Sequence, residues 1–398
     1  MRVVFLHPDL GIGGAERLVV DAAVALDRKG HQVKVVTNHY DEKHCFKETR
    51  DLDIKQIKWF PRTIFGHMWA LCAYIRLCLA AIYVCFNENF DVVFCDQVSA
   101  ALLVFKIYSL FNSNFRTIFY CHFPDMLLTK RESSMKKLYR SVIDRIEEWS
   151  TGMADVICVN SEFTASVVRD TFKSLQNHQL RVIHPSLNTK FFDSIKVGSD
   201  VDDLISHAEY TFVSLNRFEV KKNVKLAIEA FIELKDLLPE ELYKKCHLTI
   251  AGGYDSINAE NIRYFGELKK YAEEHLEEAQ CRFIRSPSDE VKVALLRSSR
   301  AVLYTPDREH FGIVPVEAMY CASPVIAVNT GGPLETIKNN ETGFLVNQTA
   351  VEFAKCMAKL VENQDLYLKM KKKGPERVRK LFSFEAFSAR LDRLVKEE

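Results

Sequence analysis

The amino-acid sequence predicts an α/β protein with two doubly wound domains, each built on a parallel sheet between layers of helices. Three observations support this prediction. Short apolar runs alternate with amphipathic helical patterns, which is typical of parallel sheets covered on both faces. The alternation stops at a polar segment near mid-chain and then starts again. The length of 398 residues suits two domains of ordinary size.

The first half opens on the apolar run 3–6, which indicates a buried strand and is too short for a signal peptide. A glycine-containing turn follows, and the apolar spacing from Leu18 to Leu26 predicts a helix that ends at Gly30. Further strands are expected at residues 32–37, 91–95, 116–121 and 154–159.

The second half begins after a polar stretch. We expect a first domain at 1–190, a linker at 191–208 and a second domain at 209–380. In open α/β sheets ligands bind beyond the carboxyl ends of the strands, so two such domains predict a cleft between them. The strands of the second domain are expected at 210–215, 247–251, 281–284, 301–304 and 324–328.

Composition excludes several classes of protein. With 54 basic and 53 acidic residues the net charge is +1, so no overall field would draw the chain onto nucleic acid. The eleven cysteines are odd in number and scattered, and the sequence contains neither CxxC nor HExxH. A disulfide framework and a zinc site are therefore not expected, and the cysteines fit a reducing compartment.

One segment, residues 69–86 from Trp69 to Phe86, is apolar throughout except for Arg76. Its length is at the lower limit for crossing a bilayer. We favour a buried helix of the first domain, because the segment directly precedes the strand at 91–95. A spanning helix and a helix lying in the membrane interface, with Trp69 at headgroup level, are the alternatives.

The first motif is the turn 11–14, which follows a strand and opens a helix, where backbone amides favour an anion. Gly11 and Gly13 fit a dinucleotide fingerprint, but Glu16 stands where the third glycine belongs, and no GK[ST] follows. NAD and ATP are therefore disfavoured. A tight turn without a ligand is an equally good interpretation.

The second motif, residues 216–223, follows the first strand of the second domain. Arg217 can fork onto phosphate oxygens and Lys222 adds a point charge. A solvated basic loop is the alternative, although the position after a strand favours phosphate binding.

The third motif is a pair of glutamates, Glu309 and Glu317, that flank seven residues. Pro315 suits the first helical position, which would place Glu317 in the first turn, where it can accept hydrogen bonds from a ribose diol. Glu309 precedes the helix and can reach a sugar. Glutamates are common at helix starts, so the pair indicates a nucleotide-sugar site only in combination with the other two motifs.

In this order the three motifs resemble retaining glycosyltransferases of family four, which have the GT-B fold. Longer stretches are similar to the eukaryotic mannosyltransferases of the dolichol-linked oligosaccharide pathway. These stretches read HPDLGIGGAERLV, CDQVSA, FYCHFPDMLLTKR, NRFEVKKN, AGGYD and EHFGIVPVEAMY. The resemblance covers essentially the whole chain, and it implies that the last helix, at 381–398, crosses back to the first domain.

The resemblance also implies roles for single residues. Gly13 and Gly14 match the turn that approaches the donor, and His122 matches a first-domain histidine near the reacting sugar, although on sequence alone it reads as a core histidine. Glu309 matches the glutamate that contacts the donor sugar, and Glu317 the one on the ribose. Arg217 and Lys222 match the residues that bind the diphosphate, although the adjacent Lys221 leaves open which lysine takes that position. Phe311, Gly312 and Ile313 match residues that lend backbone groups to the sugar and the phosphate.

The activity implied is transfer of mannose from GDP-mannose to Man-GlcNAc2-diphosphodolichol, in α-1,3 and then α-1,6 linkage, with retention of configuration. The place implied is the cytosolic face of the endoplasmic reticulum membrane, beside other enzymes of the pathway. No metal or other cofactor is expected, because fixed cations neutralise the diphosphate, and the string Asp200-Val201-Asp202 is expected to be a solvated loop. A basic run could attract anionic lipid or simply face solvent; it comprises Lys130, Arg131, Lys136, Lys137 and Arg140.

Two other functions stay open at this point. Another enzyme of the same family would use a UDP-sugar or a phosphatidylinositol-type lipid, and base choice would lie in residues 285–299, which we cannot decode. A catalytically silent adaptor is disfavoured, because the expected site residues are all present. The sequence contains no motif that supports a phosphorylase or a dehydrogenase.

Overall fold

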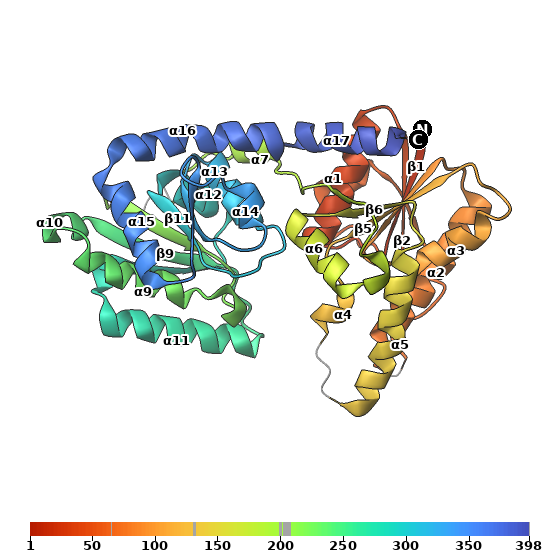
Figure 1. The fold of residues 1–398 in the computed structure, drawn as a ribbon, viewed down its shortest axis with the longest axis horizontal. Helices are drawn as coiled ribbons and strands as arrows, with labels where there is room; N and C mark the ends of the chain where they lie inside the picture. The colour runs from red at the N-terminus through yellow and green to blue at the C-terminus, as the bar shows by residue number, and fades with distance from the viewer. Residues whose placement is uncertain (65, 130–132, 199–200, 202–207, 398) are drawn as a thin grey trace. The chain divides into compact units, whose positions relative to one another are not determined.

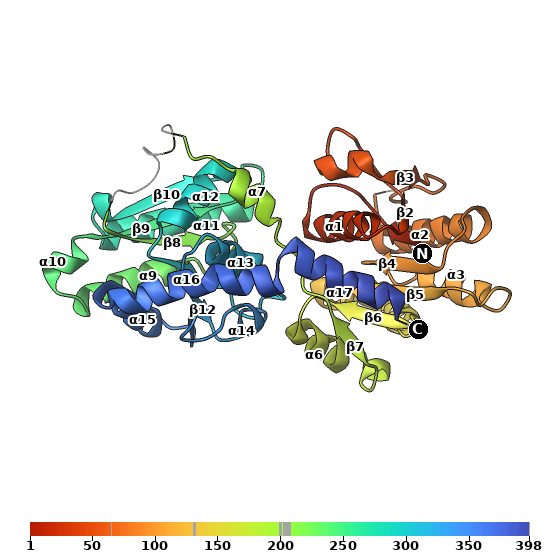
Figure 2. The ribbon, with the colours of Figure 1, turned by 90° about the horizontal axis from the view of Figure 1, so that it is seen from above.

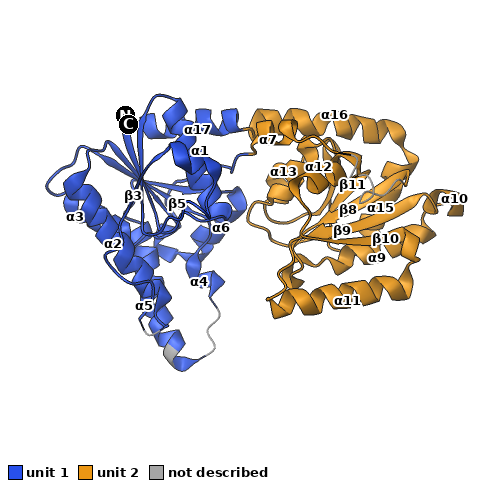
Figure 3. Ribbon diagram, turned by 180° about the vertical axis from the view of Figure 1, so that it is seen from behind, with its two compact units in different colours: residues 1–186, 384–398 blue, residues 187–383 orange. Residues whose placement is uncertain are grey.

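The computed structural model describes residues 1–64, 66–129, 133–198, 201 and 208–397. The chain divides into two compact units, one made of residues 1–186 and 384–398 and the other of residues 187–383 (Figure 3). Each unit contains a parallel sheet with helices on both faces. The predicted α/β, doubly wound architecture is therefore confirmed.

The sheet of the first unit has the strand order β3-β2-β1-β4-β5-β6-β7, and every pair is parallel. The order reverses between β1 and β4, so the carboxyl ends of these two strands lie at a topological switch point. The strands are β1 (Arg2–His7), β2 (Gln32–Thr37), β3 (Asp53–Gln56), β4 (Val92–Asp96), β5 (Arg116–Cys121), β6 (Val156–Val159) and β7 (Leu180–Val182).

Helices cover both faces of this sheet. One core packs α2, α3 and α6 against it, and the opposite core packs α1 and α17. The helices of the unit are α1 (Gly14–Arg28), α2 (Trp69–Asn87), α3 (Ala101–Tyr108), α4 (Asp125–Leu128), α5 (Ser134–Thr151), α6 (Glu162–Thr171) and α17 (Phe384–Lys396), with short 3-10 turns at Lys47–Asp51 and Lys173–Leu175.

The apolar segment 69–86 forms α2. Seven of its residues are buried, and the helix packs on α3 and on the first two strands, so it belongs to the core of the first unit. Among the described residues it is also the one helix long and apolar enough to cross a membrane. Its outward side exposes 63% of Trp69 and 78% of Phe86. The inner face of α2 is therefore buried, as the favoured interpretation expects, while its outer face is apolar and exposed.

The second sheet has the order β10-β9-β8-β11-β12-β13, again parallel throughout. All five predicted strands of this domain are present, within a residue or two at their ends. The strands are β8 (Tyr210–Leu215), β9 (Cys246–Gly252), β10 (Cys281–Arg285), β11 (Ala301–Tyr304), β12 (Val325–Val328) and β13 (Gly343–Val346).

In the second unit α9, α11 and α15 pack on one face of the sheet, while α7, α12, α13 and the end of α16 pack on the other (Figure 1). The helices are α7 (Thr189–Ser194), α9 (Lys225–Glu233), α10 (Glu240–Tyr243), α11 (Ala259–His275), α12 (Asp289–Ser298), α13 (Ile313–Tyr320), α14 (Pro333–Thr336), α15 (Ala350–Glu362) and α16 (Gln364–Leu381), with 3-10 turns at Val220–Lys222, Leu234–Asp236 and Glu278–Gln280.

The last helix, α17, lies along α1 in the first unit (Figure 2). Its apolar face enters that core through Phe387 and Leu391, and Nε2 of His31 lies 2.7 Å from a carboxylate oxygen of Asp392. The helix begins at Phe384 rather than at residue 381, because α16 continues to Leu381.

The boundary between the units falls at residue 186, four residues before the expected one. The start of the expected linker is helical instead, since α7 buries Phe192 in the second core and Asp193 accepts a hydrogen bond from Tyr320 at 2.8 Å. The later part of the expected linker lies largely outside the described residues.

The sequence pattern does not predict the strands β3, β7 and β13. All three are edge strands of their sheets. Edge strands are partly exposed, as the alternating burial of β3 and the half-buried end of β13 illustrate. They therefore lack the continuous apolar run that marks a central parallel strand.

Candidate active site

The first unit brings three polar side chains together at the carboxyl ends of neighbouring strands. His7 ends β1, Asp96 ends β4, and His122 directly follows β5. Nδ1 of His7 lies 2.9 Å from Oδ2 of Asp96, and Nε2 of His122 lies 2.9 Å from Oδ1 of the same carboxylate. Parallel pairing in the order β1-β4-β5 makes this row possible, because it places the three strand ends side by side.

The carboxylate at the centre of this row is held ionised. Burial by itself would raise the pKa of Asp96, but the facing rings of His122 and His7 outweigh it and lower that pKa. An ionised carboxylate only accepts hydrogen bonds, so both ring nitrogens that face it carry protons. His7 is fully buried, and its Nε2 has no hydrogen-bond partner among the described residues.

His122 is the member of the row that reaches solvent, with 24% of its side chain exposed. Because Asp96 engages Nε2, the second ring nitrogen, Nδ1, is left to act as an acceptor in the neutral ring. The backbone is tightly constrained beside this carboxylate, since Gln97 has the left-handed φ of 67°. The arrangement orients the ring of His122 and leaves its Nδ1 facing away from the carboxylate.

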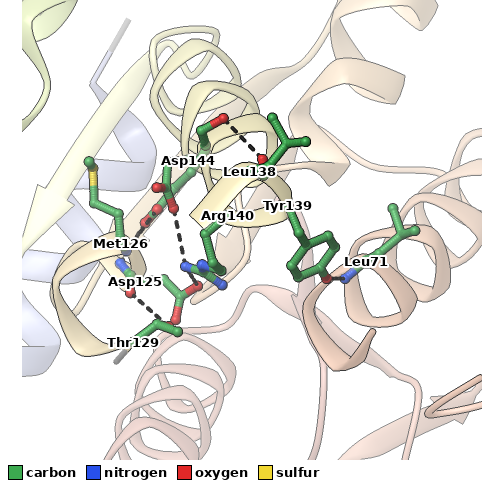
Figure 4. A network of polar contacts seen from close by, with 10 residues as sticks. Leu71, Asp125, Met126, Thr129, Leu138, Tyr139, Arg140 and Asp144 are labelled. Atoms are coloured by element: carbon green, nitrogen blue, oxygen red, sulfur yellow. Dashed lines mark hydrogen bonds and ion pairs between the residues drawn. The ribbon is translucent and has the colours of Figure 1, made fainter. Parts of the chain in front are cut away.

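A polar network anchors the chain just after His122 (Figure 4). The carboxylate of Glu147 on α5 accepts from the backbone N–H groups of Asp125 and Met126, at 2.6 and 3.1 Å. Arg140 lies between Asp125, at 2.7 Å, and Asp144, at 3.3 Å. These contacts fix Asp125 and Met126 against α5.

This network corrects part of the expected basic run. Arg140 is only 3% exposed, so it is an internal anchor and not part of a lipid-facing charge. Its neighbours on α5, Lys136 and Lys137, are exposed as expected. Lys130 and Arg131 lie outside the described residues.

The glycine turn before α1 shows why Glu16 matters. Gly13 caps the helix in extended conformation and Gly14 is its first residue. A Cβ on Gly13 would collide with the carboxylate of Glu16, so this acidic side chain folds over the helix start. A carboxylate at that place is favoured by the helix dipole, and an anionic ligand there would have to displace it.

In the second unit, Lys222 and Glu309 come together. Nζ of Lys222 lies 2.6 Å from Oε1 of Glu309, and Tyr304 donates to the other carboxylate oxygen at 3.3 Å. Thr305 donates to the carbonyl of Lys222 at 2.8 Å, which ties the loop after β8 to the end of β11. The structure thus joins a cation and a carboxylate that the sequence analysis placed on a diphosphate and on a sugar.

Arg217 and Lys221 occupy a different environment from Lys222. Both pair with Glu219, at 3.1 and 3.2 Å, and their side chains are 65% and 68% exposed, whereas Lys222 is 11% exposed. Gly252 is required nearby, because a Cβ there would collide with the carbonyl of Asn216. Of the two adjacent lysines, Lys222 is therefore the one held at Glu309.

The loop from Glu309 to Ile313 is shaped by close backbone approaches. The N–H of Gly332 donates to the carbonyl of Glu309 at 2.7 Å, and a Cβ on Gly332 would collide with Phe311. Gly312 has a left-handed φ of 77°, and Ile313 is the first residue of α13. The side chain of Phe311 is buried.

The helix α13 starts two residues earlier than predicted. Pro315 is its third residue, so Glu317 lies beyond the first turn. The left-handed Gly312 sets this start. Glu317 instead pairs with Lys292 of α12 at 3.1 Å, and burial raises its pKa although Lys292 opposes that effect.

Among the described residues, no group of three or more His, Cys, Asp or Glu side chains is arranged to hold a metal ion. Asp200 and Asp202 lie outside the described residues. All eleven cysteines lie within the described ranges and are free.

Two family models match the chain. The one described as Glycosyltransferase Family 4 matches residues 12–191, and the one described as Glycosyl transferases group 1 matches residues 200–377. Curated relatives named alpha-1,3/1,6-mannosyltransferase ALG2, from Mus musculus and Homo sapiens, are each 49% identical over 399 residues. The matches cover 99% of this chain and 95% of each relative. The chain belongs to the ALG2 family of alpha-1,3/1,6-mannosyltransferases.

Solved structures place this ALG2-family chain in the GT-B fold. Sucrose-phosphate synthase from Thermosynechococcus elongatus superposes with a TM-score of 0.74 at 20% identity, over 99% of this chain and 98% of the other. At this identity the likeness concerns the fold alone. It confirms the fold that the sequence motifs implied.

The residues that sequence reasoning missed in this ALG2-family chain are the partners of the expected ones. His7 and Asp96 each end an apolar run, so aligning the strand ends would have placed them beside His122. Lys292 lies inside 285–299, the region that could not be decoded. No local pattern indicates that it faces Glu317.

The buried carboxylate of Glu147 makes a pH-dependent prediction. Burial raises the pKa of Glu147 from its ordinary 4.5 to about 7. Between these values the unfolded chain has lost the proton that the folded chain keeps, so stability falls as pH rises from 4.5 to 7. In Glu147→Gln, the free energy of unfolding should therefore fall by about 3 kcal/mol less over this pH range than in the wild type.

The measurement is chemical denaturation of the full chain at several pH values. All three tryptophans, Trp59, Trp69 and Trp149, belong to the first unit, so their fluorescence follows that unit. Glu162→Gln, at an exposed position in the same unit, controls for losing a carboxylate. Parallel pH curves for wild type and Glu147→Gln would contradict the prediction.

Proposed function

We propose that this enzyme transfers mannose from GDP-mannose to the lipid-linked acceptor Man-GlcNAc2-diphosphodolichol, in α-1,3 and α-1,6 linkage, during assembly of the N-glycan precursor. Membership of the ALG2 family supports the two linkages. The observation that carries donor binding is the contact of Lys222 with Glu309, because it places a phosphate-binding cation beside a sugar-binding carboxylate.

On the donor side, each expected group has a distinct task. Arg217 is exposed enough to exchange Glu219 for a diphosphate oxygen, and Lys222 adds a second charge. Glu309 would then accept from the hydroxyls of the sugar. Glu317 would accept from the ribose diol while Lys292 holds its orientation.

Backbone groups complete the donor site in this proposal. The left-handed Gly312 exposes the first amides of α13, including that of Ile313, toward a phosphate, and Phe311 contributes its backbone. The turn at Gly13 and Gly14 lets a ligand approach the start of α1 closely. Glu16 would swing away on binding.

The chemistry follows from the charges that develop. Breaking the bond between the anomeric carbon and the diphosphate builds negative charge on the leaving oxygen and positive charge on the sugar. Once they are bound to the diphosphate, Arg217 and Lys222 stabilise the former. Because these cations neutralise the diphosphate, we propose that transfer needs no metal ion or other cofactor.

On the acceptor side, we assign His122 to the reacting sugar. Asp96 holds its Nε2, so Nδ1 can accept a hydrogen bond from a sugar hydroxyl, and the same carboxylate stabilises the ring once it is protonated. His7 holds Asp96 from the opposite side. Asp96 and His7 are positioning residues in this scheme.

The deciding experiment combines purified protein, labelled GDP-mannose and a synthetic Man-GlcNAc2-diphospholipid, with products read by mass and by linkage-specific mannosidases. Two mannoses should be added, one α-1,3 and one α-1,6, in the presence of EDTA. Lys222→Gln should lower kcat/KM about 100-fold, because it leaves a developing charge unpaired. Lys221→Gln, its exposed neighbour, is the matched control.

Three outcomes would contradict this function. Competition by UDP in place of GDP would indicate another nucleotide donor, and transfer only to an inositol lipid would indicate another acceptor. Binding without any transfer would indicate a silent adaptor. Loss of activity with EDTA would contradict the metal-free mechanism.

The histidine row gives a second test. Asp96→Asn keeps the shape but loses the ionised acceptor, so His122 should lose both its orientation and the stabilisation of its protonated form. We expect kcat to fall about 100-fold, with a displaced pH profile and little change in donor KM. His7→Asn, which keeps an N–H close to the position of Nδ1, should do less. If both variants lost activity equally and in proportion to a fall in melting temperature, the role of these residues would be purely structural.

We further propose that the first unit rests on the cytosolic face of the endoplasmic reticulum membrane. Three apolar side chains line one side of α5, since Leu138, Val142 and Trp149 are 72, 53 and 62% exposed. Lys136 and Lys137 are exposed in the first turn of the same helix, about 160° and 100° around its axis from Leu138. An apolar stripe with basic neighbours suits the headgroup region of an anionic bilayer. Free cysteines fit the reducing cytosol.

Flotation with anionic vesicles tests this surface. The double variant Lys136→Gln/Lys137→Gln should weaken partitioning about tenfold or more, at roughly 1 kcal/mol for each charge. Leu138→Ser should weaken it as well. Leu368→Ser, at an exposed leucine of α16 in the second unit, is the control. Unchanged flotation of the α5 variants would remove this surface from the proposal.

A further inference from the structure

The single charge of α2, Arg76, lies at the carboxyl edge of the first sheet. Its Nη2 donates to the carbonyl of Asn38, the residue that follows β2, at 2.9 Å. Asn38 in turn is buried, and its Nδ2 donates to the carbonyls of Ile57 and Arg76 at 3.1 Å each. One hydrogen bond to a backbone carbonyl therefore places the guanidinium at the edge where β2 ends.

The hydrogen-bonding capacity of this guanidinium is largely unused. Its Nε is buried without a partner among the described residues, as is Oδ1 of Asn38. The more deeply buried Arg140 of the same unit, by contrast, has Asp125 and Asp144 as carboxylate partners. Arg76 makes no such ion pair with a described residue. A half-buried guanidinium without a carboxylate partner keeps its charge available to an anionic ligand.

A second cation lies close by. Arg62, in the segment after β3, forms an ion pair with Asp9, in the segment after β1, and their side chains are 48% and 40% exposed. Burial lowers the pKa of Arg76, and the charge of Arg62 lowers it further while that of Asp9 opposes this. Leu10, next to Asp9, donates to the carbonyl of His39, next to Asn38, at 2.8 Å, so the ion pair and Arg76 lie at neighbouring strand ends. Two guanidinium groups and one carboxylate leave this cluster with a net positive charge.

We propose that Arg62 and Arg76 form a subsite for the diphosphate of the lipid-linked acceptor. This inference rests on the proposed function. Guanidinium forks match phosphate oxygens in pairs, and two of them suit a diphosphate better than a single phosphate. On binding, the diphosphate takes the place of Asp9 at Arg62 and gives Arg76 the anionic partner it lacks. The donor cations, Arg217 and Lys222, belong to the second unit and are a separate set.

The position in the sheet fits this ligand. The order β2-β1-β4-β5 separates the end of β2, at Arg76, from His122 by three strand spacings, about 14 Å. A short chain of sugar rings, joining a diphosphate to a reacting hydroxyl, spans a distance of this order. The exposed Trp69 lies two helical turns before Arg76 on α2, where an aromatic ring suits the boundary between headgroups and lipid chains.

The test compares two acceptors in detergent micelles, with the same sugars on either a diphospholipid or an uncharged linker of equal length. Arg62→Gln should raise KM for the diphosphate acceptor about tenfold or more, as expected for losing a charge-assisted contact, and leave KM for the uncharged acceptor and for the donor unchanged. Arg76→Lys, which keeps the charge but loses the fork, should act in the same direction. Arg181→Gln, at another half-exposed, ion-paired arginine of the first unit, is the control.

Equal effects on both acceptors, or a change in donor KM, would overturn the subsite. Binding of the diphospholipid at saturating GDP provides a readout that does not need turnover. If wild type binds it through Arg62 and Arg76 but transfers no mannose, the proposed function fails and the subsite stands. If Arg62→Gln weakens flotation on anionic vesicles that lack acceptor, the anion is a lipid headgroup and the acceptor assignment is wrong. Arg62 is exposed, so its variant keeps the test valid if Arg76→Lys fails to fold.

Discussion

Parallel strand pairing is the constraint on which both units depend. A parallel strand between two layers of helices is buried on both sides, so its side chains are apolar and polar groups are forced to its ends. Because all strands of a sheet run in one direction, their carboxyl ends collect at a single edge. His7 and Asp96 end two neighbouring strands and His122 follows the next one, while Lys222 and Glu309 follow two strands of the other sheet.

The charged groups expected to hold a ligand are already paired with one another. Lys222 lies against Glu309, Arg217 against Glu219, and Glu317 against Lys292. Such pairs keep flexible side chains near the geometry that a ligand requires. They also avoid the free-energy cost of an unpaired charge while no ligand is bound. In the proposed donor site, binding is then partly an exchange of partners, in which a diphosphate replaces Glu219 at Arg217 while Lys292 stays on Glu317.

The fold and part of the site could be predicted from sequence because their signals are local. Buried strands such as β8 and β12 are apolar runs, and Arg217 and Glu309 lie in the loops that follow β8 and β11. Edge strands such as β3 carry no such run. The start of α13 was misplaced, since a proline pattern could not reveal that the left-handed Gly312 begins the helix earlier.

Partnerships between distant residues could not be predicted at all. Arg140 reads as one more charge in a basic run, and only the packing of α5 against the segment after His122 turns it inward. Lys292 and Glu317 are likewise brought together by the packing of α12 beside α13. Side-chain pairing of this kind depends on tertiary contacts, which a single sequence does not contain.

The return of α17 to the first unit has a consequence for synthesis on the ribosome. The face of α1 that receives Phe387, Leu391 and Leu394 has no cover until residues 187–383 have been translated, which takes about 10 to 40 s at ordinary elongation rates. During that interval the first unit carries an open apolar groove, while the second unit can already fold around its own core. The nascent chain therefore completes its units in the reverse of their order in the sequence, and a premature stop shortly before α17 would leave the first unit permanently open.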